Sequence, residues 1–557
     1  MLDASYRHLQ AGDTAIRAAQ DDLSSSSGTG AGSTVPLREA GAAFGAARGL
    51  LGSPILAPLD IVPVLGRQLG AVRELAGDAT GVAQVGVGAV AESQAILDLP
   101  HQGGEDRVVT LQRLAALAAR TRARLAPYRP RPAQALAGPV ASAHDTYSRL
   151  FAQAEQTLGT ASEAAAATAT LLQGPSTYLL LASNNAEMRA GSGTALDAGV
   201  ITASGGSLSV SQLTDTSALA LAPGQVPVSG DLEARWGFLR PGVDWRNLGL
   251  TPQFDVNGAL AARMWQADTG QHVDGVLAVD VGGLQTLLTV TGPVTTADGT
   301  VVSAGNVETY LFHDQYAGIG YDDSTPAAQA ADAARHEKLG SLAEAVLQQL
   351  EQGSLDLRAL ARAATSATTG RHLMLWAADP TTESAWAASG VAGLVQPDSI
   401  LTALVNRGGN KLDQYVSVAD SLALTPGPGS TTNGTMTVTL ANSTPPGQSP
   451  YIAGPYPGLG DAYGDYVGYL AVTLPGTARG VSVEGTGAIA DGPQGPTWLV
   501  AVTVSLAPGQ ARRMVVHFAL PGRHGRLALV PSARIPPETW TYGSQEVDDS
   551  RPATFSW

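Results

Sequence analysis

The chain of 557 residues contains no cysteine. This absence excludes disulfide bonds, thiolate zinc sites and cysteine nucleophiles. Lysine is also scarce, since only Lys338 and Lys411 occur, and arginine carries nearly all of the positive charge. Negative charge prevails, with a net charge of −15. An acidic surface repels phosphate backbones, so the composition argues against nucleic-acid binding.

Long hydrophobic runs are missing as well. No apolar stretch reaches the roughly 18 residues that a membrane-spanning helix needs. Residues 1–17 lack the basic segment and apolar core of a signal peptide. Taken literally, the sequence predicts a chain without an anchor. The abrupt helical start at Leu2 also fits a segment whose membrane anchor lies upstream.

Common catalytic motifs are absent too. The sequence has no Gly-x-x-x-x-Gly-Lys-Ser/Thr, no Gly-x-Ser-x-Gly and no His-Glu-x-x-His. The pair His336-Glu337 is not followed by a second histidine at helical spacing, and the nine histidines are scattered. These observations exclude the standard signatures of P-loop enzymes, α/β-hydrolases and zinc metalloproteases.

Three regions differ in their hydrophobic pattern, as the length of the chain leads us to expect. Residues 1–173 are rich in alanine, leucine and arginine, and apolar residues such as Leu111, Leu114 and Leu117 recur at helical spacing. This pattern predicts a helical stalk or bundle. Short apolar strands alternate with helical segments in residues 174–405, which predicts a central α/β domain.

The third region, residues 406–557, shows a period of two. Residues 435–440 and 498–504 alternate between apolar and polar side chains, and Pro-Gly turns separate such segments. Several short strands joined by regular turns predict an antiparallel β-sandwich. The expected fold is therefore multidomain, with an all-α region, an α/β domain and a β-sandwich.

Three stretches carry a specific resemblance. Residues 178–189 consist of an apolar strand, two asparagines, a glutamate and an arginine. Residues 273–280 form a second apolar strand that continues to Val294, and residues 410–413 read Asn-Lys-Leu-Asp. The chain resembles the domain-of-unknown-function 4012 family of actinobacterial envelope proteins over nearly its whole length. The resemblance implies a cell-surface, extracytoplasmic protein that an upstream helix anchors in the membrane.

A more remote similarity concerns the central domain. Residues 274–294, followed by a helix that carries Arg335, are similar to the core of the LytR–CpsA–Psr phosphotransferases. Those enzymes transfer a glycan phosphate from a polyprenyl diphosphate carrier onto a cell-wall polymer, and they hold the diphosphate with arginines, an acidic residue and Mg²⁺. Arginine suits this task because its planar fork binds two oxygens at once. The chain lacks that family's Arg-Ser-Asp and Pro-Arg-Asp-Thr motifs.

The remote similarity implies a set of site residues. Arg189 and Arg335 would clamp the diphosphate. Asp280 would be the acidic partner and the Mg²⁺ ligand, with Asp274 as the less favoured alternative for the acidic partner. Three further residues would shape the rim of the site: Asn184, Asn185 and Glu187.

The same residues also admit structural roles. The two asparagines can cap a turn, Glu187 and Arg189 can form an ion pair, and Asp280 can cap the helix that begins near Gly282. The chain would then be a non-catalytic surface protein that mediates adhesion or assembly. Convergence of Arg189, Arg335 and a carboxylate on one pocket would favour an enzyme, and dispersal over the surface would favour the surface protein.

Overall fold

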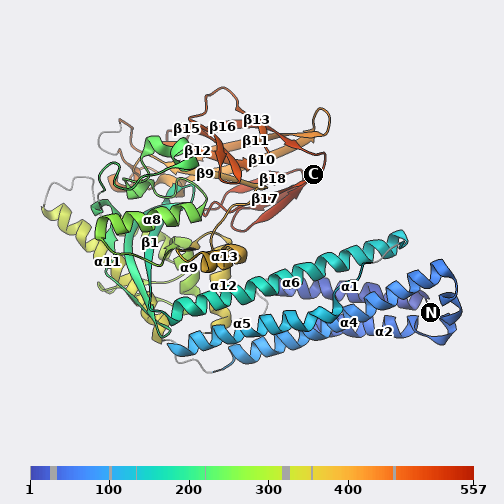
Figure 1. Cartoon of the computed structure of the whole chain (residues 1–557). Coiled ribbons are helices and arrows are strands. Elements are labelled where there is room, and N and C mark those ends of the chain that lie inside the picture. Colours follow the sequence, from blue (N-terminus) through green and yellow to red (C-terminus); the bar gives the residue numbers. More distant parts are fainter. Residues whose placement is uncertain are drawn as a thin grey trace. The chain divides into compact units, whose positions relative to one another are not determined.

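The chain divides into two compact units, Met1–Gln173 and Gly174–Trp557 (Figure 1). The computed structural model describes residues 2–24, 34–99, 103–132, 135–219, 221–316, 326–352, 356–455 and 460–557. The architecture is multidomain, with a helical N-terminal region and a β-rich C-terminal region, as the sequence predicted. The predicted boundary between residues 405 and 406 lies within the second unit and stays a prediction.

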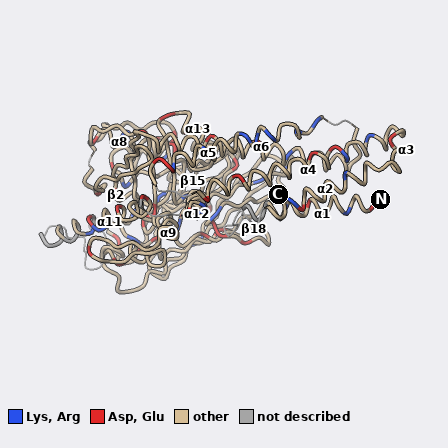
Figure 2. Tube along the Cα trace, turned by 90° about the horizontal axis from the view of Figure 1, so that it is seen from below, with Lys and Arg blue, Asp and Glu red and all other residues tan. Residues whose placement is uncertain are grey.

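The first unit is helical. Small side chains allow its helices to pack closely: Ala40 and Ala47 on α2, and Ala76 and Ala83 on α4, are all buried. Figure 2 shows α3 at one end of this unit. The bounds are α1 (Leu2–Ser24), α2 (Thr34–Leu51), η1 (Pro54–Leu56), α3 (Ala57–Asp60), α4 (Pro63–Leu97), α5 (Glu105–Leu125), η2 (Ala126–Tyr128) and α6 (Gly138–Gln173).

Within the described residues, no single helix is both long and apolar enough to cross a bilayer. The bent pair Thr34–Leu51 and Pro54–Asp60 meets the criterion of length and composition.

The second unit begins with a mixed sheet of order β3-β2-β1-β5-β8, in which β4 pairs with β2. The second apolar strand, predicted within residues 273–280, is β5, which runs parallel to β1 and antiparallel to β8. Val276 is fully buried, as expected for an interior strand. The bounds are β1 (Ser176–Arg189), β2 (Ser192–Ser204), β3 (Ser207–Val210), β4 (Thr214–Asp215), β5 (Gly275–Val279) and β8 (Leu373–Ala377).

Helices and short turns surround this sheet (Figure 1). They are η3 (Thr216–Ala218), α7 (Gly230–Trp236), η4 (Gly237–Leu239), η5 (Trp245–Asn247), α8 (Phe254–Thr269), α9 (Val281–Thr291), α10 (Val307–Phe312), η6 (Asp314–Tyr316), α11 (Pro326–Gln352), α12 (Leu357–Thr369) and α13 (Pro380–Ser389), with a small hairpin of β6 (Val294–Thr295) and β7 (Val301–Val302). The predicted helix that carries Arg335 is α11.

Two further sheets of six strands follow, with the orders β13-β16-β11-β10-β18-β19 and β14-β15-β12-β9-β17-β20. They share one hydrophobic core, in which Met436 and Val438 of β11 lie with Val500 and Val502 of β15. The bounds are β9 (Ser399–Asn406), η7 (Leu412–Tyr415), β10 (Val416–Pro426), β11 (Thr431–Asn442), α14 (Pro450–Ala453), β12 (Tyr466–Pro475), β13 (Arg479–Val483), β14 (Ala490–Gln494), β15 (Thr497–Leu506), β16 (Ala511–Pro521), β17 (Arg526–Leu529), β18 (Thr539–Tyr542), β19 (Gln545–Asp548) and β20 (Ala553–Ser556).

Both sheets are mixed, so the prediction of a purely antiparallel arrangement is wrong. β18 pairs in parallel with β10, and β17 pairs in parallel with β9. Each pair joins strands far apart in sequence, so no hairpin turn fixes their direction. The first sheet packs against this region, because Leu179 of β1 and Val405 of β9 share one hydrophobic cluster.

Candidate functional site

The polar end of β1 lies inside the second unit. β1 does not stop after its apolar residues but continues as a strand to Arg189, which pairs with Ser192 of β2. Asn184, Asn185, Glu187 and Arg189 are therefore buried, with at most 5% of each residue exposed. The residues that were expected to form a solvent-exposed rim thus form a buried polar cluster. Their hydrogen-bonding and charged groups find partners in segments from later in the chain.

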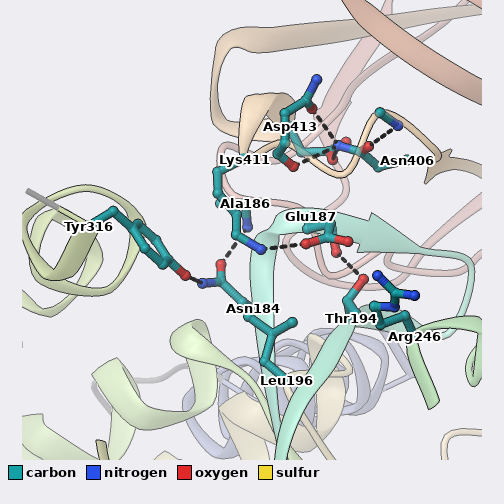
Figure 3. A network of polar contacts seen from close by, with 12 residues as sticks. Asn184, Ala186, Glu187, Thr194, Leu196, Arg246, Tyr316, Asn406, Lys411 and Asp413 are labelled. Atoms are coloured by element: carbon teal, nitrogen blue, oxygen red, sulfur yellow. Dashed lines mark hydrogen bonds and ion pairs between the residues drawn. The ribbon is translucent and has the colours of Figure 1, made fainter. Parts of the chain in front are cut away.

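Glu187 is the acidic centre of this cluster (Figure 3). Its carboxylate accepts a hydrogen bond from Nζ of Lys411 and lies 3.5 Å from Nη2 of Arg189. Burial raises the pKa of Glu187, but the positive charges of Lys411 and Arg189 outweigh this effect and hold the pKa below its ordinary value. Glu187 is therefore an ionised, paired carboxylate, and the predicted structural ion pair with Arg189 is confirmed.

The guanidinium of Arg189 also binds three backbone carbonyl groups. Nε donates to the carbonyl of Arg246 at 2.6 Å. Nη1 donates to the carbonyls of Met188 and Asn406, both at 2.9 Å. These bonds tie the end of β1 to η5 and to the last residue of β9. Most donors of this arginine are thus occupied by the protein itself.

Asp413 joins several elements through one carboxylate. Oδ2 accepts hydrogen bonds from the backbone N of Met188 and from Nδ2 of Asn406, both at 2.9 Å. Oδ1 accepts from the hydroxyl of Tyr466 at 3.1 Å and from Nη1 of Arg534 at 3.0 Å. β1 is thereby linked to β9, β12 and the segment before β18. Burial raises the pKa of Asp413, and Arg534 opposes this rise.

Asp280 occupies the carboxyl end of β5. It caps α9 by accepting a hydrogen bond from the backbone N of Gly283 at 3.0 Å, which confirms the capping role. Its carboxylate also accepts from Nδ2 of Asn185 at 2.7 Å and from Oγ of Ser192 at 2.8 Å. Nδ1 of His372 lies 2.9 Å from both oxygens. Asn185 and Asp280 are therefore neighbours, as the site prediction requires.

The surroundings of Asp280 do not fit Mg²⁺. The ion requires oxygen ligands in near-octahedral geometry, yet both oxygens of Asp280 already face donors of the protein. In the part of the chain that the structure describes, no group of three or more His, Cys, Asp or Glu side chains could hold a metal ion.

The remaining predicted residues lie in two places: Asp274 beside the start of β1, and Asn184 and Arg335 around Tyr316. Asp274 lies at the opposite end of β5 from Asp280 and accepts a hydrogen bond from the backbone N of Thr177 at 2.7 Å. Nδ2 of Asn184 donates to the carbonyl of Leu311 at 3.1 Å and to the hydroxyl of Tyr316 at 3.0 Å. Asp274 therefore holds the start of β1, and Asn184 anchors its polar end to α10 and η6.

Arg335 lies on α11 and is buried. Its Cζ lies 5.8 Å from the ring centroid of Tyr316, and its Nη2 lies 3.9 Å from Oδ2 of Asp215. Lys411, which pairs with Glu187, also lies over Tyr316 at 5.8 Å. Arg335 and Arg189 are therefore at two ends of one buried polar cluster. Neither is dispersed over the surface, and Lys411 and Tyr316 lie between them.

His372 is expected to make stability depend on pH. Burial lowers the pKa of His372, but Asp280 raises it more, with smaller contributions from Asp549 and Glu308, so the pKa lies above its ordinary value. The stabilisation is full below the unfolded pKa of about 6.5 and is lost as pH rises through the folded value. We expect His372→Gln to be less stable by roughly 1.5 kcal/mol at pH 5.5, with a smaller deficit at high pH. Urea unfolding at several pH values tests this, and a deficit independent of pH would contradict it.

Four residues of this cluster were absent from the predicted site: His372, Lys411, Asp413 and Arg534. Lys411 and Asp413 belong to the stretch at residues 410–413, which carries part of the family resemblance but was assigned no site residue. A signal was available for Lys411, because a lysine is conspicuous in a chain that otherwise uses arginine. His372 and Arg534 carry no motif, and only the fold brings them to β1 and β5.

The comparisons with known proteins bear on part of the chain. Residues 173–316 match the family model described as "Protein of unknown function (DUF4012)". The match supports the predicted family for this segment, which contains β1, β5 and Asp280. No curated protein and no solved structure matches the chain.

Proposed function

We propose that this chain is a non-catalytic surface protein of the cell envelope that mediates adhesion or assembly. In this proposal, Asn184, Asn185, Glu187 and Arg189 form a structural clasp that locks the first sheet onto the C-terminal sheets. The observation that carries it is the burial of Glu187, Arg189 and Lys411 with their charged groups bound to one another and to backbone carbonyls. The envelope location rests on the family resemblance alone.

Desolvation supports a structural role. Removing charged groups from water costs several kcal/mol for each ion, and only partners with good geometry offset that cost. Glu187 and Arg189 have such partners within the protein. A diphosphate would have to break these bonds and compete with Glu187 for the same cations. The cluster is therefore better suited to holding segments together than to exchanging a ligand.

The other regions take their roles from this proposal. The two C-terminal sheets, which share one core, would form a β-sandwich. Its surface would bind a partner protein or a cell-wall polymer. The helical unit would act as a stalk, anchored upstream of this sequence.

A second candidate is a phosphotransferase-like enzyme that binds a polyprenyl-diphosphate-linked glycan. One observation favours it: Asn185, Asp280 and His372 gather at the carboxyl end of β5, where α/β sheets commonly bind ligands. The side chain of His372 keeps 17% of its surface exposed. This candidate requires Arg335 to leave its place over Tyr316 or to bind the diphosphate there.

Calorimetry with a soluble polyprenyl diphosphate analogue and Mg²⁺ separates the two candidates. We expect no binding heat with the wild-type chain, with Arg335→Ala or with Arg263→Ala, a control on the exposed part of α8 in the same unit. Wild-type binding that weakens about tenfold or more in Arg335→Ala, the scale of a lost charge-assisted hydrogen bond, and stays unchanged in Arg263→Ala would overturn the structural proposal. Circular dichroism of each variant confirms that it is folded.

A further inference from the structure

The segment that connects α2 to α4 exposes large aliphatic side chains. We call residues 52–65 the apolar tip. Ile55 is 73% exposed, Ile61 83% and Val64 65%. Val62 and Leu65 are exposed as well. A soluble surface rarely gathers so many branched aliphatic residues in one short segment, and such patches mark interaction sites.

The apolar tip is held in shape from the inside. Leu51, Leu56 and Leu69 form a small buried cluster beneath it. Arg73 of α4 donates to the carbonyl of Leu51 at 2.6 Å and pairs with Asp60 at 2.8 Å. The backbone of the apolar tip is therefore held in one conformation by buried contacts, and this conformation exposes its outer aliphatic side chains.

Charge is confined to the border of the apolar tip. Between Arg48 and Arg67 the only charged residue is Asp60, which Arg73 neutralises. Arg67 is an exposed cation, although the chain as a whole carries a net charge of −15, and the guanidinium of Arg48 lies further away, against Gly77 of α4. Arg67 lies four residues beyond Pro63, which corresponds to roughly 6 Å along the helix axis. That depth is similar to the roughly 5–10 Å to which interfacial elements enter a bilayer.

The composition of the apolar tip distinguishes a bilayer from a protein partner. Interfaces between proteins are enriched in aromatic residues, methionine and arginine. Residues 52–65 contain no aromatic residue and no methionine, and consist largely of Ile, Leu, Val, Pro and Ala. We propose that the apolar tip inserts into the interfacial layer of an anionic lipid bilayer, with Arg67 at the level of the headgroups. Figure 2 shows α3 at the end of the helical unit.

The absence of cysteine permits a direct test. A single cysteine at Ile61→Cys is labelled with an environment-sensitive fluorophore, and a cysteine at Leu99→Cys, past the other end of α4, serves as the control. Vesicles of phosphatidylcholine with about one third phosphatidylglycerol should shift the emission at position 61 to shorter wavelength, and should leave position 99 unchanged. Salt should weaken this binding, because anionic lipids attract Arg67. No shift at position 61, or an equal shift at both positions, would overturn the proposal.

Vesicle flotation of the unlabelled chain gives the second readout. The triple variant Ile55→Ser/Ile61→Ser/Val64→Ser should lower the partition coefficient about 100-fold, since each lost aliphatic side chain weakens burial in the bilayer by several-fold or more. Val35→Ser, which changes an apolar side chain that is 51% exposed at the start of α2, should bind like the wild type. The substituted side chains are exposed, so helicity should be unchanged. Equal flotation of the triple variant and the wild type, or failure of the wild type to float, would contradict membrane insertion.

Discussion

The Lys411→Met variant should lose about 3–5 kcal/mol of unfolding free energy, because breaking a buried ion pair leaves an uncompensated charge. Glu187, whose residue surface is 5% exposed, would keep only Arg189 as an ionic partner at 3.5 Å. Methionine retains most of the aliphatic volume of lysine, so the loss reports the charge and not a cavity. Tryptophan fluorescence during urea unfolding measures it, since all eight tryptophans lie in the second unit.

The other lysine of the chain is a matched control. Lys338 pairs with Asp298 at 2.8 Å, but both side chains are more than one third exposed. Solvent screens such a pair, and Lys338→Met should therefore cost at most about 1 kcal/mol. Equal losses of unfolding free energy in the two variants would show that the buried ion pair of Lys411 stabilises the fold no more than an exposed pair does, which would contradict the structural clasp.

Arg534→Met is expected to destabilise the second unit by a similar amount, about 3–5 kcal/mol. The guanidinium pairs with Asp413 at 3.0 Å and donates to the carbonyls of Asp413 and Val416. Both charged side chains are almost fully buried. Removing the arginine also leaves Glu538, 3.7 Å from its Nε, without this nearby positive charge.

Arg526→Met is the corresponding control. Arg526 pairs with Asp398 at 3.0 Å, yet its side chain is 74% exposed. Its loss should change the unfolding free energy by at most about 1 kcal/mol. The prediction is contradicted if Arg534→Met unfolds at the same urea concentration as the wild type. It is also contradicted if Arg526→Met is destabilised more than Arg534→Met.

Much of the fold follows from local patterns. Helical periodicity predicted the first unit, and the apolar runs predicted β1 and β5, because a buried strand must be apolar on the faces that it hides. The parallel pairings of β17 and β18 could not be predicted. These strands come late in the chain and pair with β9 and β10, and no local turn records their direction.

The buried polar cluster was harder to predict for a related reason. The polar run after the apolar part of β1 is typical of an exposed loop, and only partners far along the chain make its burial possible. Lys411 is 224 residues away from Glu187, and Asn185 donates to the carbonyl of Ala533, 348 residues away. The capping role of Asp280 was predictable because its partner, Gly283, is local.

A double-mutant cycle on Glu187 and Lys411 tests the structural clasp most directly. Unfolding free energies are measured by tryptophan fluorescence for the wild type, Glu187→Gln, Lys411→Met and the double variant. If the clasp is structural, each single variant is strongly destabilised. The double variant should then be at least about 2 kcal/mol more stable than the sum of the two single losses implies, because residues in contact are energetically coupled. Losses of unfolding free energy below about 0.5 kcal/mol in each single variant, which add in the double variant, would contradict the structural clasp. Glu187 and Lys411 would then be candidate ligand-binding groups.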